Sequence, residues 1–441
     1  MPKPPPCPDS CNVLLVGGGG REHALAWKLR QSRRLGRLWT TDRSNPAIQS
    51  IARQCPVEMD VKRPFHLQQW CTRERIDLVV VGPEQPLADG IADALSTPER
   101  MVFGPSKSGA RMEADKAFAK NIMRQASVPT AEGRIFTDLE SAIEYVTVRE
   151  EPCVVKATGL AAGKGVVVCD DEHEAIAALQ EIMGARVHGE AGATVLVEER
   201  LHGQEVSVMA LVDGHTIWIL DPAQDHKQRD EGDSGPNTGG MGAYCPTPVL
   251  DDAMLARIQR DILIPTVAGL RREGIDYRGV LYAGLMLTPG GPKVLEFNCR
   301  FGDPETQPLM ARLQGDLVEI CWATAAGTLD DVQIGFDPRT ACCVVLCSAG
   351  YPGAYEKGRV ITGIDAAEAA GGAGRVTVFH AGTATTPAGD LVTAGGRVLS
   401  VTALGQDLAT ARDLANDAAD QIRFDGSFFR RDIGDRVLAP S

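Results

Sequence analysis

The sequence lacks the features that would place the chain in a membrane, in a secretion pathway or on nucleic acid. No apolar run approaches the ~20 residues that a membrane-spanning helix needs, and the proline-rich first residues have no apolar signal-peptide core. Lys and Arg number 45 against 58 Asp and Glu, which gives a formal net charge of −13 and argues against a broad basic surface. We expect a cytoplasmic protein without nucleic-acid or membrane partners, in which a local cluster of cations could still hold a small anion.

Metal-binding spacings are also missing. The 12 cysteines are scattered through apparent strands and helices, and the eight histidines form no HExxH pair. Buried, reduced thiols are the expected state of these cysteines. The remaining composition, 44% hydrophobic and 23% charged residues over 441 positions, is typical of a globular chain with roughly three domains.

A glycine-rich loop, TGLAAGKG, lies between two apolar runs that predict short strands. It does not have the Walker A spacing, because three residues separate the glycines and a glycine follows the lysine. The loop should instead join two strands, so that its backbone amides and two lysines could cradle a polyphosphate. A glycine-rich hairpin with solvated lysines is an equally good interpretation. The residues concerned are Lys156, Gly159, Gly163, Lys164 and Gly165.

Near the start of the chain, the apolar run 12–16 is followed by four glycines and a helix pattern, which predicts the opening of a βαβ unit. Such a turn directs helix N-terminal amides toward an anion, and Arg21 stands beside it. The spacing departs from GxGxxG, because Glu22 occupies the third glycine position. Asp42 lies where a ribose-binding acid lies in dinucleotide folds, so an NAD-binding alternative stays open.

Other polar residues stand next to predicted elements of the first half of the chain. Glu84 follows the strand pattern 76–81, where it could contact a substrate or stabilise a helix N-terminus. A helix pattern over 113–120 should present Lys116. The strand pattern 195–199 ends in two carboxylates that could face an adenine and a ribose, although a passive polar turn is the favoured interpretation of that stretch alone.

A long polar, glycine-rich segment covers residues 221–246 and shows no periodicity. Loops of this length inside compact domains are usually functional or disordered. Beyond it, runs 279–287 and 293–297 predict a β-hairpin. Alternation along its second strand places Glu296 and Asn298 on one face, where a carboxylate and an amide oxygen suit Mg²⁺. Arg300, on the same face of the strand, could bind a phosphate or a carboxylate through two parallel hydrogen bonds.

The last part of the chain, from about Asp337, suggests a small mixed α/β unit. Strand patterns cover 341–347 and 398–402, and apolar residues at helical spacing cover 406–422. These patterns predict a packed helix against a short sheet.

Several motifs in one order resemble glycinamide ribonucleotide synthetases, a family of the ATP-grasp superfamily. The resemblance runs from about residue 12 to 437, and its most specific stretches are GPNTGGMGAY and VLEFNCRFGDPETQP, with GGREHALAWK, GPEQPL and KATGLAAGKGVVV in support. It implies a flexible tail (1–11), an N-terminal doubly wound parallel-sheet domain (12–112), an ATP-grasp pair (113–336, with a flap subdomain about 130–198) and a small mixed α/β C-terminal domain (337–441).

The resemblance also implies an activity and its residues. The activity is ATP-dependent ligation of glycine to 5-phosphoribosylamine through glycyl phosphate, with Mg²⁺ or Mn²⁺, in purine biosynthesis. We expect the protein to be a monomer. ATP phosphates would bind Lys116, Lys156, Gly159, Gly163, Lys164 and Gly165, and the nucleoside would bind Glu198, Glu199, Leu201 and Glu205. The metal would bind Glu296 and Asn298. The substrates would bind Gly18, Gly19, Arg21, Glu22, Glu84, Asp225, Lys227, Asn237 and Arg300, with Arg300 and Asp303 in catalysis.

The sequence departs from the family pattern in places, and other functions stay open. Thr158 replaces an acid, TDRSNPAIQ leaves only Asn45 to match a turn, and LYAGLML offers no second metal carboxylate. Another ATP-grasp ligase, such as a carboxyaminoimidazole ribonucleotide synthetase, is one alternative. An NAD(P)-dependent oxidoreductase and a non-catalytic nucleotide sensor are the others.

Overall fold

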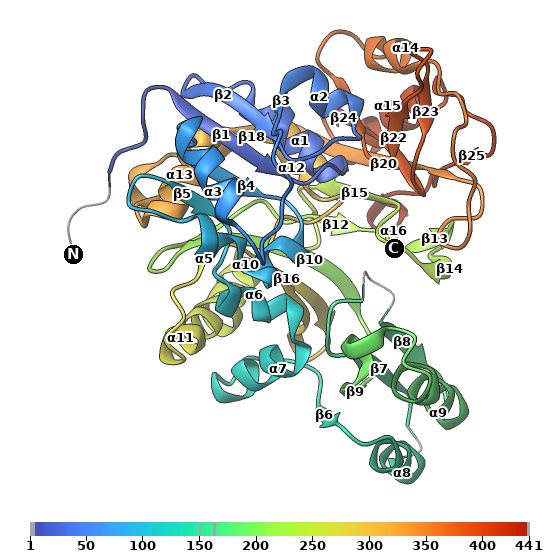
Figure 1. Cartoon of the computed structure of the whole chain (residues 1–441). Helices are drawn as coiled ribbons and strands as arrows, with labels where there is room; N and C mark the ends of the chain where they lie inside the picture. Colours follow the sequence, from blue (N-terminus) through green and yellow to red (C-terminus); the bar gives the residue numbers. More distant parts are fainter. Residues whose placement is uncertain (1–4, 150, 162–164, 439–441) are drawn as a thin grey trace.

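Five parallel strands form the first sheet, in the order β3-β2-β1-β4-β5. The computed structural model, drawn in Figure 1, describes residues 5–149, 151–161 and 165–438. The region comprises β1 (Cys11–Val16), α1 (Gly20–Leu29), β2 (Leu35–Thr40), α2 (Pro46–Ile51), β3 (Arg53–Gln54), α3 (Phe65–Arg73), β4 (Leu78–Val81), α4 (Glu84–Asp89), α5 (Ile91–Leu95), β5 (Met101–Phe103) and α6 (Lys107–Ala114).

Helices cover both faces of this sheet. Val16 of β1 packs in one cluster with Trp70 of α3, whereas Leu15 packs in another with Leu25 of α1. Successive side chains of a strand point to opposite faces, so the two clusters lie on opposite sides of the sheet. The doubly wound N-terminal sheet that the sequence predicts is confirmed, because every pairing in it is parallel.

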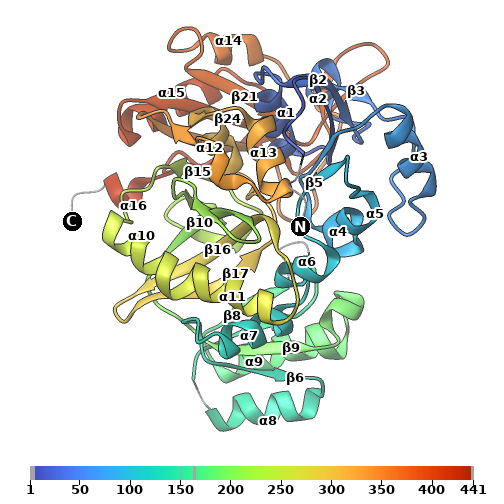
Figure 2. The same ribbon diagram turned by 90° about the vertical axis from the view of Figure 1, so that its left-hand side faces the viewer.

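A smaller lobe carries the glycine-rich loop. Figures 1 and 2 show this lobe, with α8 and α9, at one end of the molecule. Its sheet is antiparallel, in the order β6-β9-β7-β8, and the loop joins β7 to β8 as predicted. The elements are α7 (Lys116–Gln125), β6 (Gly133–Phe136), α8 (Leu139–Arg149), β7 (Cys153–Ala157), β8 (Val166–Cys169), α9 (Glu172–Leu179), the π-helical turn η1 (Gln180–Gly184), the 3₁₀ turn η2 (Gly189–Gly192) and β9 (Val195–Glu199).

A third sheet, β11-β10-β16-β17, is antiparallel and lies between the first sheet and the lobe. The predicted hairpin forms its β16 and β17, with a bulge at Leu295. The elements are β10 (Gln204–Asp213), β11 (Ile217–Ile219), α10 (Asp252–Ile258), the π-helical turn η3 (Gln259–Leu263), α11 (Ile264–Arg272), β16 (Arg278–Thr288), β17 (Gly291–Asn298), α12 (Thr306–Arg312), β18 (Leu313–Gln314), α13 (Leu317–Ala326), the 3₁₀ turn η4 (Leu329–Asp331) and β19 (Gly335–Phe336).

The last sheet combines strands from two distant parts of the chain. Its order is β12-β15-β20-β24-β21, and β25 also pairs with β20. The elements are β12 (Gln224–Asp225), β13 (Gln228–Asp230), β14 (Ser234–Asn237), β15 (Gly242–Cys245), β20 (Thr340–Ser348), α14 (Ile364–Ala369), β21 (Val376–His380), β22 (Thr383–Thr385), β23 (Leu391–Thr393), β24 (Arg397–Gly405), α15 (Leu408–Ala419), β25 (Ser427–Phe428) and α16 (Asp435–Leu438).

The segment 221–246 is therefore ordered, and it contains four short strands. β15 pairs antiparallel with β20, with Gly242 opposite Val344. A strand about a hundred residues further along the chain supplies these hydrogen bonds. No local pattern within the segment itself predicts these hydrogen bonds.

The sequence predicts one helix over 113–120. This prediction is wrong, because the helix is interrupted at Asp115, between α6 and α7. Asp115 has extended backbone angles (φ −143°, ψ 90°), and its side chain accepts a hydrogen bond from the amide of Phe118. An N-cap aspartate of this kind starts a new helix. Lys116 consequently occupies the first turn of α7.

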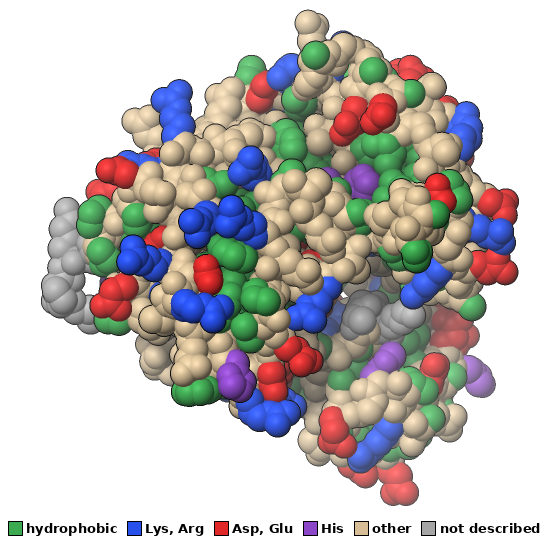
Figure 3. All heavy atoms as spheres, turned by 45° about the horizontal axis from the view of Figure 1, so that its top comes forward, with side chains coloured by type: hydrophobic (Ala, Val, Ile, Leu, Met, Phe, Trp, Pro, Cys, Tyr) green, Lys and Arg blue, Asp and Glu red, His purple; other side chains and the backbone are tan. Residues whose placement is uncertain are grey.

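Charge on the surface is mixed. On the face shown in Figure 3, Lys and Arg side chains lie interspersed with Asp and Glu side chains. Across the described part of the chain, no helix has both the length and the apolar character needed to cross a bilayer.

Candidate active site

A cavity of about 400 Å³ lies where the first sheet, the lobe and the two later sheets meet. Wider recesses of about 690 and 610 Å³ lie along α4–α6 and beside α7 and β6, and each is lined by neighbouring segments only. The smaller cavity instead collects charged side chains from all four sheets or their connections. These are Arg21, Glu84, Glu113, Lys116, Lys120, Lys156, Glu198, Glu296, Arg300, Asp303 and Arg397.

Two lysines of the lobe are tied to one carboxylate. The Lys156 ammonium lies 2.6 Å from Oε2 of Glu198 and donates to the Leu295 carbonyl at 3.0 Å. Lys120 pairs with the other oxygen of Glu198 and donates to Thr130 Oγ1 at 2.9 Å. Glu198 thus neutralises part of the lysine charge, and its place beside the nucleoside stays a prediction.

Lys116 contacts the start of the glycine-rich loop. Its backbone amide donates to the Thr158 carbonyl at 2.8 Å, and its ammonium donates to the Gly159 carbonyl at 3.3 Å. Burial lowers the pKa of Lys116, while Glu296 acts against this shift. A half-buried ammonium with one backbone partner retains donors for an anion.

The ends of the glycine-rich loop border the cavity. Leu160, Ala161 and Gly165 line it, and the Ala157 amide donates to the Gly165 carbonyl at 2.7 Å. A Cβ on Gly159 would lie 2.7 Å from the Ala191 backbone, so a side chain there would not fit. The predicted Gly163 and Lys164 lie outside the described residues.

Glu296 and Asn298 share the cavity-lining face of β17, as their spacing predicts. Burial acts to raise the pKa of Glu296, but Lys227, Lys156, Lys116 and Arg300 outweigh it and hold the carboxyl below its usual range. An ionised carboxylate and an amide oxygen form a donor pair that fits a hard divalent cation. Within 5–149, 151–161 and 165–438, no cluster of three or more His, Cys, Asp or Glu could hold a metal.

Arg300 is held between two carboxylates. Its Nη2 lies 2.8 Å from Glu113 Oε1, and its Nε lies 3.4 Å from Glu84 Oε2. Burial acts to raise the pKa of Glu84, and Arg300 is the main opposing influence that brings it below the usual range. Glu113 also accepts the Cys299 amide at 2.8 Å, which anchors α6 to the end of β17.

The N-terminal glycine turn is closed by Arg21 and Glu22, both buried. Arg21 Nε lies 2.6 Å from Glu22 Oε1, and its Nη1 donates to the Phe301 carbonyl at 3.1 Å. The other oxygen of Glu22 accepts the Gly19 amide at 2.6 Å. Glu22 therefore shapes the turn, and Arg21 is the member of the pair that lines the cavity.

Asp42 and Asn45 play parts that the sequence left open. The Asp42 carboxylate accepts the amides of Ser44 and Asn45, at 3.1 and 2.6 Å. The Asn45 amide donates to the carbonyls of Gly18 and His380, at 2.9 and 2.8 Å. Asp42 thus closes a turn, which disfavours a ribose-binding role, and Asn45 joins the glycine turn to β21.

Among the predicted site residues that the structure describes, ten do not line the cavity. One, Glu199, pairs with Lys293 at 2.8 Å beside the lobe. Lys227 lies 3.1 Å from Glu205 and 3.9 Å from Asp225, and burial raises the pKa of Asp225 to about 7 although Lys227 opposes the shift. Asn237 is exposed on β14. The full set off the cavity lining is Gly18, Gly19, Glu22, Gly159, Glu199, Leu201, Glu205, Asp225, Lys227 and Asn237.

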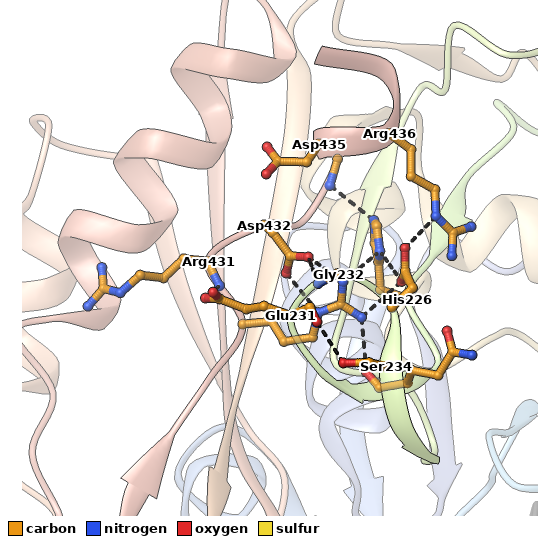
Figure 4. Close-up of polar contacts among 12 residues, drawn as sticks. His226, Glu231, Gly232, Ser234, Arg431, Asp432, Asp435 and Arg436 are labelled. Carbon is orange, nitrogen blue, oxygen red and sulfur yellow. Dashed lines mark hydrogen bonds and ion pairs between the residues drawn. The ribbon is translucent and has the colours of Figure 1, made fainter. Parts of the chain in front are cut away.

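His226, between Asp225 and Lys227, is held by the C-terminal segment. Its Nε2 accepts the Gly434 amide at 3.0 Å, and its Nδ1 lies 3.2 Å from Asp233 Oδ1. Because Nε2 accepts, the ring proton lies on Nδ1 and points to Asp233. Figure 4 shows His226 and, beside it, the contact in which the Gly232 amide donates to Asp432.

A buried arginine completes the same cluster. Arg430 lies 3.0 Å from Asp233 and 2.7 Å from Asp432, and it is almost fully buried. The C-terminal segment therefore holds the His226 side chain and the Gln228 carbonyl, close in the chain to Asp225 and Lys227.

Sequence reasoning missed Glu113, Lys120 and Arg397. Lys120 stands four residues after Lys116, on the same face of one helix, which was an available signal. Glu113 opens the stretch 113–120, of which only Lys116 is a predicted site residue. Arg397 had no local signal beyond its GGR turn.

A glycine-rich loop between antiparallel strands, facing a second antiparallel sheet across a cavity of lysines and acids, defines an ATP-grasp ligase. Family models for phosphoribosylglycinamide synthetase match in three parts: the N domain over 11–113, the ATP-grasp (A) domain over 114–306 and the C domain over 341–436. The chain belongs to the phosphoribosylglycinamide synthetase family, as the motifs predict. It is an ATP-dependent ligase of purine biosynthesis.

Individual relatives agree with this assignment. The chain is 49% identical to a phosphoribosylamine–glycine ligase of Rhodopirellula baltica, over 97% of this chain and 98% of that protein. It is 47% identical to part of a trifunctional purine biosynthetic protein of Gallus gallus, over 97% of this chain and 42% of that protein. A crystal structure of a phosphoribosylamine–glycine ligase from Thermotoga maritima superposes with a TM-score of 0.78 at 31% identity, covering 96% of this chain and 100% of that one.

Proposed function

We propose that this chain joins glycine to 5-phosphoribosylamine, converting ATP to ADP and phosphate through a glycyl phosphate intermediate. The carrying observation is that one cavity brings the lysines of the lobe and the β17 donors together with Arg21 of the glycine turn. Two anionic substrates can then meet in a protein whose net charge is −13. The local cations provide the attraction that the whole molecule does not.

The nucleotide would lie between the lobe and β17. Lys116 and Lys156 would contact its phosphates, together with the backbone of the loop around Gly159 and Gly165. Phosphoryl transfer depends mainly on positioning and charge neutralisation, which these groups supply. The strand β9 and the start of β10, with Glu199, Leu201 and Glu205, would border the nucleoside.

The reaction proceeds in two displacements. A carboxylate oxygen of glycine attacks the γ-phosphorus, and the bond from that phosphorus to the β-phosphate oxygen breaks, which releases ADP. The amine nitrogen of phosphoribosylamine then attacks the acyl carbon, and the carbon–oxygen bond to phosphate breaks as the nitrogen loses a proton. Arg300 would orient the glycine carboxylate, and closure of the lobe would keep water from the acyl phosphate.

Mg²⁺ or Mn²⁺, when bound, would neutralise charge on the transferring phosphates. Glu296 and Asn298 would hold it from β17. Asp303 would face the amine substrate near the glycine turn, with its carboxyl ionised. Burial acts to raise the pKa of Asp303, but Arg397, Arg21, Gln307 and Arg300 outweigh it and keep that pKa low.

We also propose the division into a tail (1–11, of which 1–4 lie outside the described residues), an N-terminal domain (12–112), an ATP-grasp region (113–336, flap about 130–198) and a C-terminal domain (337–441). β12 pairs with β15 and β15 pairs with β20, so strands of the ATP-grasp region and of the C-terminal domain share one sheet. The protein would act as a cytoplasmic monomer.

The decisive assay measures ADP release with ATP, glycine and freshly prepared phosphoribosylamine, each omitted in turn. We expect release only when all three are present. Release that needs bicarbonate and ignores glycine would indicate another ATP-grasp ligase, a class that shares the fold. Release without an amine substrate, or cofactor absorbance changes with NAD, would contradict the proposal.

A further inference from the structure

Arg397, the first residue of β24, binds segments outside its own sheet. Its Nη1 donates to the carbonyls of Gly239 and Asp303, at 2.7 and 2.9 Å. Its Nη2 donates to Asp303 Oδ2 at 2.9 Å. The guanidinium lines the cavity from the side of the last sheet, and its charge helps to keep the pKa of Asp303 low.

The Asp303 carboxylate is held from two directions and faces the glycine turn. Gln307 Nε2 donates to Oδ1 at 2.9 Å, opposite the Arg397 contact on Oδ2. A Cβ on Gly20 would lie 3.7 Å from Oδ1, and a Cβ on Gly19 would lie 3.9 Å from Oδ2. The carboxylate is therefore in contact range of the turn to which the proposed function assigns phosphoribosylamine.

A carboxylate at this position favours one end of that substrate. It would repel the phosphate of phosphoribosylamine and attract the amine, which carries N–H donors and must lose a proton on ligation. Orientation matters here, because small misplacements of a reacting nitrogen cost large factors in rate. Whatever holds Asp303 therefore affects how the amine is presented.

We propose that Arg397 is a positioning residue for the amine substrate: it holds Asp303 and the Gly239 segment so that the carboxylate faces the amine beside the glycine turn. This inference rests on the proposed function. The last sheet then contributes a side chain to the substrate pocket, in addition to supporting the fold. Arginine suits the task because its planar fork grips a carboxylate oxygen and two carbonyls at once, which the single ammonium of lysine does not.

The test is steady-state kinetics of Arg397→Gln and Arg397→Lys, with glycine, ATP and phosphoribosylamine varied separately. We expect Arg397→Gln to raise the KM for phosphoribosylamine roughly ten- to a hundredfold, with the KM for ATP within about twofold. Arg397→Lys should recover part of the loss, because it keeps the charge. Arg359→Gln is the matched control: it removes a guanidinium of the same region, which pairs with Glu356 and Asp425 at the surface.

The outcomes separate the inference from the function on which it rests. A wild type without glycine-dependent ADP release overturns the proposed function and this inference together. An active wild type whose Arg397→Gln variant changes both KM values equally, or neither, overturns the inference alone. The thermal midpoint of each variant shows whether the fold is kept. If Arg397→Gln unfolds, Arg397→Lys carries the test, and an unchanged KM for phosphoribosylamine in that folded variant also overturns the inference.

Discussion

Lys156 on β7 lies 2.6 Å from Glu198 on β9, and both side chains are almost fully buried. The second oxygen of Glu198 pairs with Lys120 of α7, so one carboxylate links two strands of the lobe to the helix that enters it. Buried charges need such partners, since an unpaired one carries a large desolvation cost. We infer that Glu198 holds Lys156 and Lys120 in place.

Replacing Glu198 with Gln should destabilise the protein. The amide keeps the shape but leaves two buried ammonium groups without their counter-charge, and breaking a buried pair costs roughly 3–5 kcal/mol. Urea unfolding followed by circular dichroism measures the loss. Glu199→Gln is the control, because its pair with Lys293 is about 30% exposed and should contribute less than about 1 kcal/mol. Equal losses of stability in the two variants would show that the Glu198 ion pairs contribute no more than the exposed pair of Glu199.

Glu296→Gln and Asn298→Ala should disrupt metal-dependent turnover while leaving the fold intact. Each change removes a donor to an ion that neutralises phosphate charge, which should raise the transition-state barrier by on the order of several kcal/mol. Activity is measured while Mg²⁺ is titrated, with Mn²⁺ binding to the ATP complex as an independent readout. Near-normal activity of both variants at limiting Mg²⁺ would show that the metal lies elsewhere.

Arg21→Ala should raise the KM for phosphoribosylamine and leave the KM for ATP nearly unchanged. Arg21 borders the cavity at the glycine turn, away from the lobe, and losing one charged partner costs roughly 1.5–3 kcal/mol. Kinetics with one substrate varied at a time measures both constants. A fall in ATP affinity with an unchanged phosphoribosylamine dependence would falsify this division between the two glycine-rich segments.

Asp225 should make stability depend on pH in an unusual direction. Burial raises its pKa to about 7 from 3.8, despite Lys227. The folded protein therefore keeps a proton that the unfolded chain releases above about pH 4, so this contribution is complete below about pH 4 and is lost as the pH rises through about 7. Relative to Asp225→Asn, the wild type should lose up to about 4 kcal/mol across that window.

The measurement is the free energy of unfolding of both proteins at several pH values between 4 and 8. Taking the difference between them cancels the other titrating groups. A difference that stays constant, or that moves in favour of the wild type as the pH rises, would contradict the raised pKa.

The positions that the sequence predicted well are those where local pattern and chemistry coincide. Lys116, Lys156 and Glu296 each stand at the end of an apolar run or a helix start, and all three line the cavity. Alternation along β17 placed Asn298 on the same face as Glu296. The division of substrates among these residues stays a prediction, since geometry alone does not name the bound molecule.

The sequence by itself determined the family and the residues that follow strand ends, because periodicity and short motifs are local. The tertiary structure decided which of these residues meet. In the folded chain, Glu198 pairs with two lysines and β15 pairs with β20. Arg397 contacts Asp303, which lies 94 positions earlier in the chain. Such contacts depend on how whole sheets pack, and a pattern of a few residues carries no information about a partner that distant.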